Sequence, residues 1–80
     1  MGVQATLSEM IQRFVSGAET SITHANAIEV VIDDNFPNDL FLQQTVEMLA
    51  MYRPGGGEFL FDTPQIRQRL IETAEYLRTV

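Results

Sequence analysis

The sequence predicts an all-α protein, a compact domain of four helices that spans residues 1–80. Three observations lead to this prediction. Apolar residues recur at helical spacing in four segments, and glycine, proline or polar residues separate these segments. Apolar residues make up 45% of the chain, which is enough to form a core. Because the chain has no cysteine, that core has to stabilise the fold without disulfides.

The first helix is predicted before Gly17, a residue type that commonly ends a helix in a left-handed conformation. Thr6 followed three residues later by Glu9 matches a capping box and predicts the start of this helix. The spacing i, i+3, i+4, i+7 and i+8 gives it one buried face, formed by Leu7, Met10, Ile11, Phe14 and Val15.

The second helix is expected from Ile22 to about Asn35, with apolar residues at mixed spacings of three and four. Residues 27–32 are rich in β-branched side chains, so a short buried strand is the alternative there. Pro37 disfavours helical geometry at the residue before it, which ends the helix near Asn35. Asn35 or Asn38 is then expected to cap the next helix.

The third helix is predicted over residues 38–52, with a broad apolar face, and Pro54 and three glycines end it. Residues 58–61 form a short apolar run that could be extended. Asp62 or Thr63 is expected to cap the fourth helix, with Pro64 near its first position. Its buried face comprises Ile66, Leu70, Thr73, Ala74 and Leu77.

The charge of the chain is negative and unevenly distributed. The net charge is −6, and all five basic residues are arginines. Residues 19–62 carry eight acids against Arg53 alone, a net charge of −7. This balance disfavours binding to nucleic acids and anionic lipids and favours a basic protein partner. No segment approaches the length of about 20 apolar residues that crosses a bilayer, so we expect a cytoplasmic protein that does not contact the membrane.

The segment RPGGGEFLF, residues 53–61, is the most unusual part of the chain. Three successive glycines permit close approach to the backbone, and the neighbouring aromatic residues and arginine are types enriched at interfaces. The alternative is a tight reversal between two helices whose phenylalanines close the core. A phosphate-binding loop is excluded, because Glu58 and Phe59 stand where a lysine and a hydroxyl residue are needed.

The acidic cluster around Asp33 does not match a calcium loop. Counted from Asp33, the fifth position is Pro37, the sixth is Asn38 instead of glycine, and the twelfth is Gln44 instead of glutamate. His24, expected in the first turn of the second helix, is the only histidine. No nucleophile with an adjacent base is visible. We therefore expect no metal site, no cofactor and no catalytic residues.

These observations favour a non-catalytic protein-interaction module, such as an adaptor, a regulator or an inhibitor-like protein, that engages a basic protein. The expected partner-binding residues are Asp33, Asp34, Asp39, Tyr52, Arg53, Gly55, Gly56, Gly57, Glu58, Phe59 and Phe61. The alternative is a homodimer, with a seam formed by Met48, Met51, Tyr52, Phe59 and Phe61. A weaker alternative is a metal-binding protein or small enzyme that uses the acidic cluster.

Overall fold

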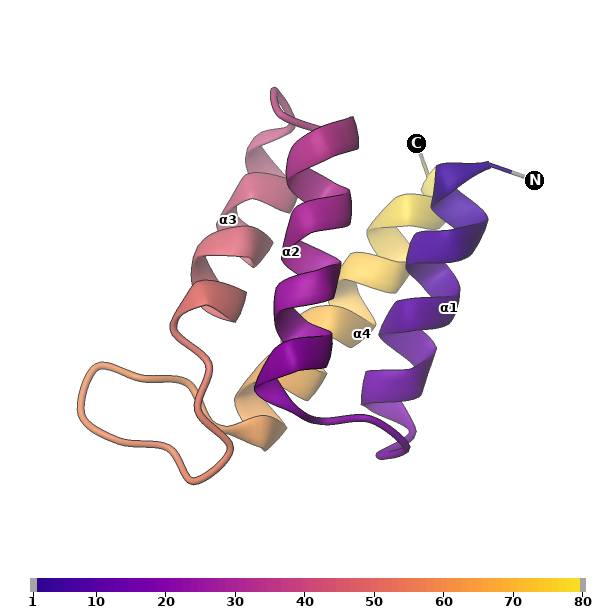
Figure 1. Cartoon of the computed structure of the whole chain (residues 1–80). Helices are drawn as coiled ribbons and strands as arrows, with labels where there is room; N and C mark the ends of the chain where they lie inside the picture. Colours follow the sequence, from indigo (N-terminus) through magenta and orange to yellow (C-terminus); the bar gives the residue numbers. More distant parts are fainter. Residues whose placement is uncertain (1, 80) are drawn as a thin grey trace.

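The computed structural model describes residues 2–79 and confirms the prediction of an all-α, four-helix domain (Figure 1). The helices are α1 (Val3–Val15), α2 (Ile22–Asn35), α3 (Leu40–Ala50) and α4 (Thr63–Thr79). Each helix packs against two others: α1 against α2 and α4, and α3 against α2 and α4. The strand alternative for residues 27–32 is wrong, because Ile28 and Ile32 lie one helical turn apart and both point into the core.

The core lies between the four helices, and each of them contributes to it. Helical spacing brings its members to one face of each helix, as the sequence predicted. The buried apolar side chains are Leu7, Ile11 and Phe14 of α1, Ala25, Ile28 and Ile32 of α2, Leu42 and Leu49 of α3, and Ile66, Leu70 and Leu77 of α4, together with Tyr52.

A buried polar seam joins α3 to α4. The hydroxyl oxygens of Thr45 and Thr73 lie 3.0 Å apart, and the Thr73 hydroxyl donates to the backbone carbonyl of Arg69 at 2.8 Å. The guanidinium of Arg69 donates to Thr45 Oγ1 at 2.9 Å and to the Phe41 carbonyl at 2.8 Å, and it lies 4.0 Å from the centre of the Phe41 ring. These bonds fix the register between the two helices, because buried polar groups left without partners would destabilise the fold.

The helix starts differ from two of the sequence predictions. The helix α1 starts at Val3, so the predicted Thr6 capping box is wrong. The extra turn is tied down by Gln4, whose side-chain amide donates to the Leu77 carbonyl at 3.3 Å. The cap of α3 is Asp39, not Asn35 or Asn38.

The end of α1 and the start of α4 agree with the sequence, whereas α3 ends at Ala50, two residues before the predicted end at residue 52. Gly17, after α1, has a φ of +87° and is left-handed as expected. Asp62 caps α4: its carboxylate accepts from the Gln65 amide at 3.0 Å, while the Gln65 side chain accepts from the Asp62 amide at 3.0 Å. This reciprocal pair is a capping box, and Pro64 follows as the second residue of the helix.

Among residues 2–79 no helix has both the length and the apolar composition to cross a bilayer. Residues 58–61 do not form a strand. A single isolated bridge joins Tyr52 to Phe61, and the positive φ of Phe59 interrupts any extended run.

Candidate functional site

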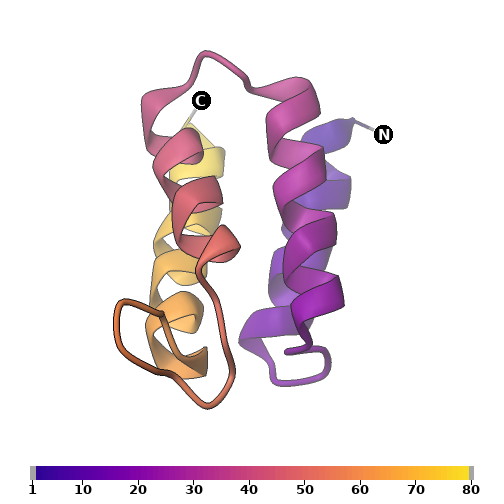
Figure 2. The ribbon, with the colours of Figure 1, turned by 60° about the vertical axis from the view of Figure 1, so that its left-hand side comes forward.

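The connection between α3 and α4, residues 51–62, is a long loop that projects from one end of the bundle (Figures 1 and 2). We call it the α3–α4 loop. Two backbone hydrogen bonds close its base: the Arg53 amide donates to the Phe61 carbonyl at 2.8 Å, and the Phe61 amide donates to the Met51 carbonyl at 2.9 Å. The base is therefore fixed while the residues between these bonds extend outward.

Tyr52 belongs to this base and not to the exposed part of the loop. Its side chain is 5% exposed, and its ring makes an edge contact with the Phe14 ring at 5.3 Å between centroids. The hydroxyl donates to the Thr20 carbonyl at 2.6 Å and lies 2.8 Å from Thr63 Oγ1. Tyr52 thus fastens the loop to two other parts of the chain, and Phe61 is partly buried against the same core. Neither residue presents a free aromatic ring to a partner.

The three glycines of the loop have different backbone roles. Gly56 and Gly57 have φ values of +73° and +152°, which side chains rarely tolerate, whereas Gly55 is not among the residues with positive φ. The Gly56 amide donates to the Arg53 carbonyl at 2.8 Å and closes a turn. A Cβ on Gly57 would lie 3.1 Å from Leu60 Cδ1. The backbone conformation therefore favours glycine at positions 56 and 57, whereas at position 55 the backbone does not require it.

Phe59 combines an unusual backbone with an exposed side chain. Its φ is 63°, and no other non-glycine residue described has a positive φ. It occupies the third position of a turn that the Leu60 amide closes on the Gly57 carbonyl at 3.1 Å. Glycine is favoured at such a position, and a side chain there costs about 1–2 kcal/mol. The ring is nonetheless 82% exposed, so it makes little contact within the chain that offsets this strain.

The remaining loop residues on the predicted list, Arg53 and Glu58, are both exposed. The ion pairs found within residues 2–79 involve Arg13, Glu9, Glu19 and His24 only. The charge of Arg53 thus lies before the turn that holds Phe59 and that of Glu58 lies within it, and neither is part of these ion pairs.

The predicted acids lie at the other end of α3 (Figure 2). Asp33 and Asp34 are exposed in the last turn of α2, and Asp39 precedes α3. The 11 residues of α3 separate this end from the loop, a distance of about 16 Å at 1.5 Å per residue. The structure therefore does not bring the acidic cluster and the loop into one continuous surface.

Asp39 differs from the other two acids because both of its carboxylate oxygens are bonded within the chain. One accepts from the Leu42 amide at 3.0 Å, and the other accepts from the Tyr76 hydroxyl at 2.6 Å. The hydrogen bond from Tyr76, followed by that from Leu42, lowers the pKa of the Asp39 carboxyl, and the same carboxylate raises the pKa of the Tyr76 hydroxyl. Asp39 thus holds the start of α3 against α4, and both oxygens of its carboxylate accept hydrogen bonds from groups of the same chain.

Glu29 is an acid on α2 that the sequence reading did not single out. It lies at the edge of the buried face, four residues after Ala25 and three before Ile32, a spacing that could have indicated its partial burial. Its Oε1 atom is shielded from solvent and has no hydrogen-bond partner. Burial, and then the neighbouring charge of Asp33, raise the pKa of the Glu29 carboxyl.

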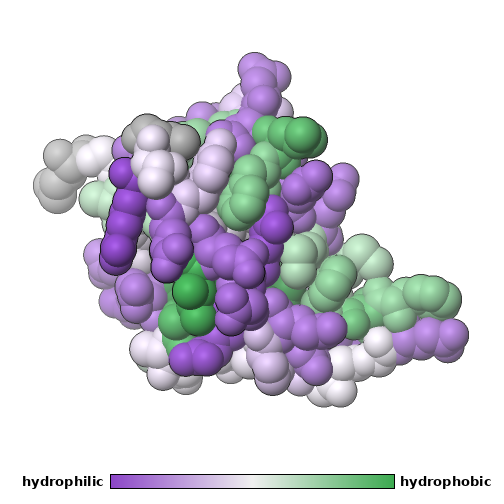
Figure 3. All heavy atoms as spheres, turned by 180° about the vertical axis from the view of Figure 1, so that it is seen from behind, coloured by the Kyte–Doolittle hydropathy of each residue, from purple (hydrophilic) through white to green (hydrophobic). Residues whose placement is uncertain are grey.

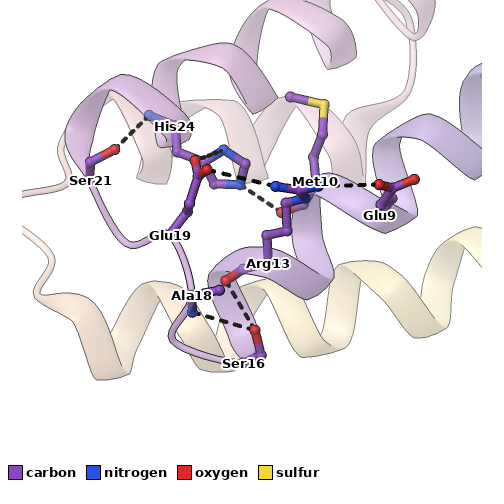
Figure 4. Close-up of polar contacts among 8 residues, drawn as sticks. All are labelled: Glu9, Met10, Arg13, Ser16, Ala18, Glu19, Ser21 and His24. Carbon is purple, nitrogen blue, oxygen red and sulfur yellow. Dashed lines mark hydrogen bonds and ion pairs between the residues drawn. The ribbon is translucent and has the colours of Figure 1, made fainter.

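A second polar cluster, also missed by the sequence reading, lies where α1 meets the start of α2 (Figure 4). An open hollow of about 330 Å³ is lined there by Thr6, Glu9, Met10, Arg13, Glu19 and His24. His24 is buried, and its Nε2 lies 2.8 Å from the Met10 carbonyl oxygen while its Nδ1 lies 3.2 Å from a Glu19 carboxylate oxygen.

The polar groups of this hollow are mostly paired with one another. Arg13 lies 3.6 Å from the Glu9 carboxylate and 3.8 Å from that of Glu19. No three acidic, histidine or cysteine side chains within residues 2–79 are grouped so that they could hold a metal ion. The arrangement fastens α1 to α2 and leaves no buried polar group directed into the hollow.

Comparison of the chain with models of known families, with curated proteins and with solved structures finds no match.

Proposed function

We propose that this chain is a non-catalytic protein-interaction module and that the outer face of α2 binds a basic segment of another protein. The observation that carries this proposal is the charge of the helix and its surroundings. Residues 14–52 contain six acids and no lysine or arginine. Of these acids, Asp33 and Asp34 are exposed at the end of α2, and Glu29 lies on the same helix.

The position of Asp33 and Asp34 within the helix is unfavourable for the isolated chain. The C-terminal end of a helix carries a partial negative charge, so acids in the last turn destabilise it by about 0.3–1 kcal/mol each. No basic residue compensates them in the last turn of α2. A cationic side chain from a partner would interact favourably with both the carboxylates and the helix end.

An exposed apolar side chain accompanies the acids on α2. Val30 is 57% exposed and lies three residues before Asp33 and four before Asp34, so it neighbours both on the helix surface, whereas Ile22, which is 45% exposed, lies in the first turn of the helix. A segment that carries both basic and apolar residues would complement this face. Electrostatic attraction would then contribute mainly to the rate of association and to the choice of partner.

Glu29 gives a further reason to expect a cation at this face. Burial raises the pKa of the Glu29 carboxyl most, and repulsion by the neighbouring charge of Asp33 raises it further. A bound guanidinium or ammonium group next to the two carboxylates would remove this repulsion, because an opposite charge nearby favours the ionised form.

The test is a pull-down from lysate of the source cell with the wild type and the double variant Asp33→Asn, Asp34→Asn. The control is Glu72→Gln, Glu75→Gln, which removes two exposed charges from α4 and changes the net charge equally. We expect a basic protein to be captured by the wild type and the control at low salt. It should be lost with the α2 variant and at high salt.

Two results would contradict the proposal. A captured partner that the α2 variant binds as well as the control does would place the binding surface elsewhere. If neither the wild type nor the control retains a basic protein at low salt, the proposed class of partner is wrong.

A further inference from the structure

We infer that the α3–α4 loop is a self-association site, at which the loops of two copies of this chain pack against each other in a symmetric dimer. This inference goes beyond the proposed function, because it concerns the α3–α4 loop instead of the outer face of α2, and a different partner. The contact would be formed by Phe59 and Met51 at its centre and by Arg53 and Glu58 at its edge.

The first observation is the apolar surface that the loop leaves uncovered. Phe59 is 82% exposed and Met51 is 41% exposed. Figure 3 shows hydrophobic atoms on the projecting loop, at the right of the view. Aromatic residues and methionine are enriched at the centres of protein interfaces, and burial of the Phe59 ring in a dimer would remove its apolar surface from water.

The second observation is that the loop is prearranged for such a contact. The two backbone hydrogen bonds at its base and the buried Tyr52 fix its ends, and two turns fix its course. Phe59 is held in a strained left-handed conformation that points its ring away from the chain. Strain that nothing within the chain offsets is typical of positions selected for binding. Little conformational entropy remains to be lost on association.

The third observation is the charge of the loop, which favours a second copy over other occupants. The chain carries −6, so most surfaces of two copies repel each other. Between residues 48 and 61 the only charged residues are Arg53 and Glu58, which sum to zero. In a two-fold contact, the Arg53 of one copy meets the Glu58 of the other, and the reverse pair forms at the same time.

The size of the loop determines the expected affinity. It offers about ten residues per copy, whereas a stable interface uses roughly 20–30 residues on each side. The dimer should therefore be weak and reversible, with monomer at low concentration and dimer at high concentration.

The test is sedimentation equilibrium from about 20 µM to about 1 mM, a range that includes the dissociation constant expected of a weak dimer. The salt concentration is about 0.15 M, which screens repulsion between distant charges but affects charges in contact less. We expect the wild type to shift from monomer towards dimer. Phe59→Gly should raise the dissociation constant about tenfold or more, the effect of a central interface residue. This variant also relieves the left-handed strain, so it should keep the fold.

The matched control is Leu40→Ser, which removes an apolar side chain that is 75% exposed at the other end of α3. It should leave the dissociation constant within about twofold of the wild type. A wild type that stays monomeric at the highest concentration overturns the inference. An equal loss of dimer in Leu40→Ser and Phe59→Gly overturns it as well, because the contact would then be a general hydrophobic one.

A charge exchange tests the symmetric arrangement of the two chains. Arg53→Glu and Glu58→Arg should each weaken the dimer, because each places like charges opposite one another. The double variant Arg53→Glu, Glu58→Arg restores opposite charges in the cross pairs and should recover most of the affinity. If the double variant is as weak as the single ones, the cross pairs do not form and the proposed geometry is overturned.

Discussion

The two ends of α3 are connected to the rest of the chain in different ways. At its start, a short connection is held by side chains. Asp39 caps the helix and accepts from the Tyr76 hydroxyl, and the side-chain amide of Gln43 donates to the Phe36 carbonyl at 3.1 Å. At its end, a long loop is held mainly by its backbone and by Tyr52. In the short connection between α2 and α3, polar side chains form hydrogen bonds within the chain. In the longer α3–α4 loop, the aromatic ring of Phe59 stays exposed to solvent.

This difference indicates which residues remain available for other molecules. The charge of Asp39 looks like a binding feature in the sequence, but it serves the fold. Phe59 makes little contact within the fold, and its backbone is strained. Two features of the structure produce this difference. The helix α3 is rigid and separates the two ends, and the hydrogen bonds described at each end fix the connection there.

The largest expected effect concerns the rigidity of α3. Leu49 is 2% exposed, so Leu49→Ala should lower the free energy of unfolding by about 2–5 kcal/mol. Met51→Ala, two residues later at a side chain that is 41% exposed, should change it far less. Urea denaturation monitored by circular dichroism measures both. Equal stability of Leu49→Ala and the wild type would contradict the core assignment of α3.

The backbone of the α3–α4 loop predicts the next largest effect. Gly56 has a φ of +73°, so Gly56→Val should destabilise the protein by about 2 kcal/mol, because a β-branched residue is strained there. At Gly55 a Cβ would meet nothing within 4 Å, and Gly55→Ala should be neutral or slightly stabilising. Thermal unfolding of the pair measures the contrast. If both variants melt together, the loop lacks the turn described.

Much of the fold could be predicted from the sequence, because helical spacing and turn residues are local signals. Such signals predicted the four helices, the end of α1 before Gly17, and a cap of α4 at Asp62 or Thr63, of which Asp62 is the one observed. The start of α1 was not, because Gln4 bonds to Leu77, a contact between the two ends of the chain that no local pattern contains. A long-range contact of this kind overrides a local capping motif.

The candidate site was less predictable, because composition does not distinguish buried from exposed aromatic residues. Tyr52 was expected to bind a partner, but it continues the spacing of Leu42, Thr45 and Leu49 on the core face of α3, and this periodicity could have indicated its burial. Phe59 lies outside any periodic segment, so its exposure follows only from the turn that places it. The acids around Asp33 and the α3–α4 loop lie at opposite ends of α3, and this separation depends on how α3 is oriented in the bundle, which no local sequence pattern contains.

The bond between Asp39 and Tyr76 predicts a dependence on pH. The pKa of Asp39 is lowered in the folded state, so its stabilising effect is present above the unfolded pKa of about 3.9 and is lost as the pH falls through the lower folded pKa. Asp39→Ala should cost about 1 kcal/mol at neutral pH through the lost cap. The difference from the wild type should shrink in strong acid. Melting temperatures at several pH values measure it, and a constant difference would argue against an ionised cap.

The smallest effect is expected at Glu29, and its sign is opposite. The pKa of Glu29 is raised in the folded state, so the protonated form is stabilising below the usual pKa, and this contribution is lost as the pH rises through the folded value. At neutral pH the folded chain therefore holds an unfavourable charge with one unbonded oxygen. Glu29→Gln, which resembles the protonated acid, should raise the melting temperature at pH 7, and this gain should disappear in acid.

The control for Glu29 has to separate this local effect from the general benefit of removing one negative charge. Glu47→Gln changes the net charge equally at an exposed position of α3. We expect Glu29→Gln to be the more stable of the two variants at pH 7 in low salt, and the two to converge below about pH 4, where carboxyl groups are mostly protonated. If Glu47→Gln stabilises the chain as much, the burial of Glu29 has no energetic consequence, and the α2 face loses this reason to bind a cation.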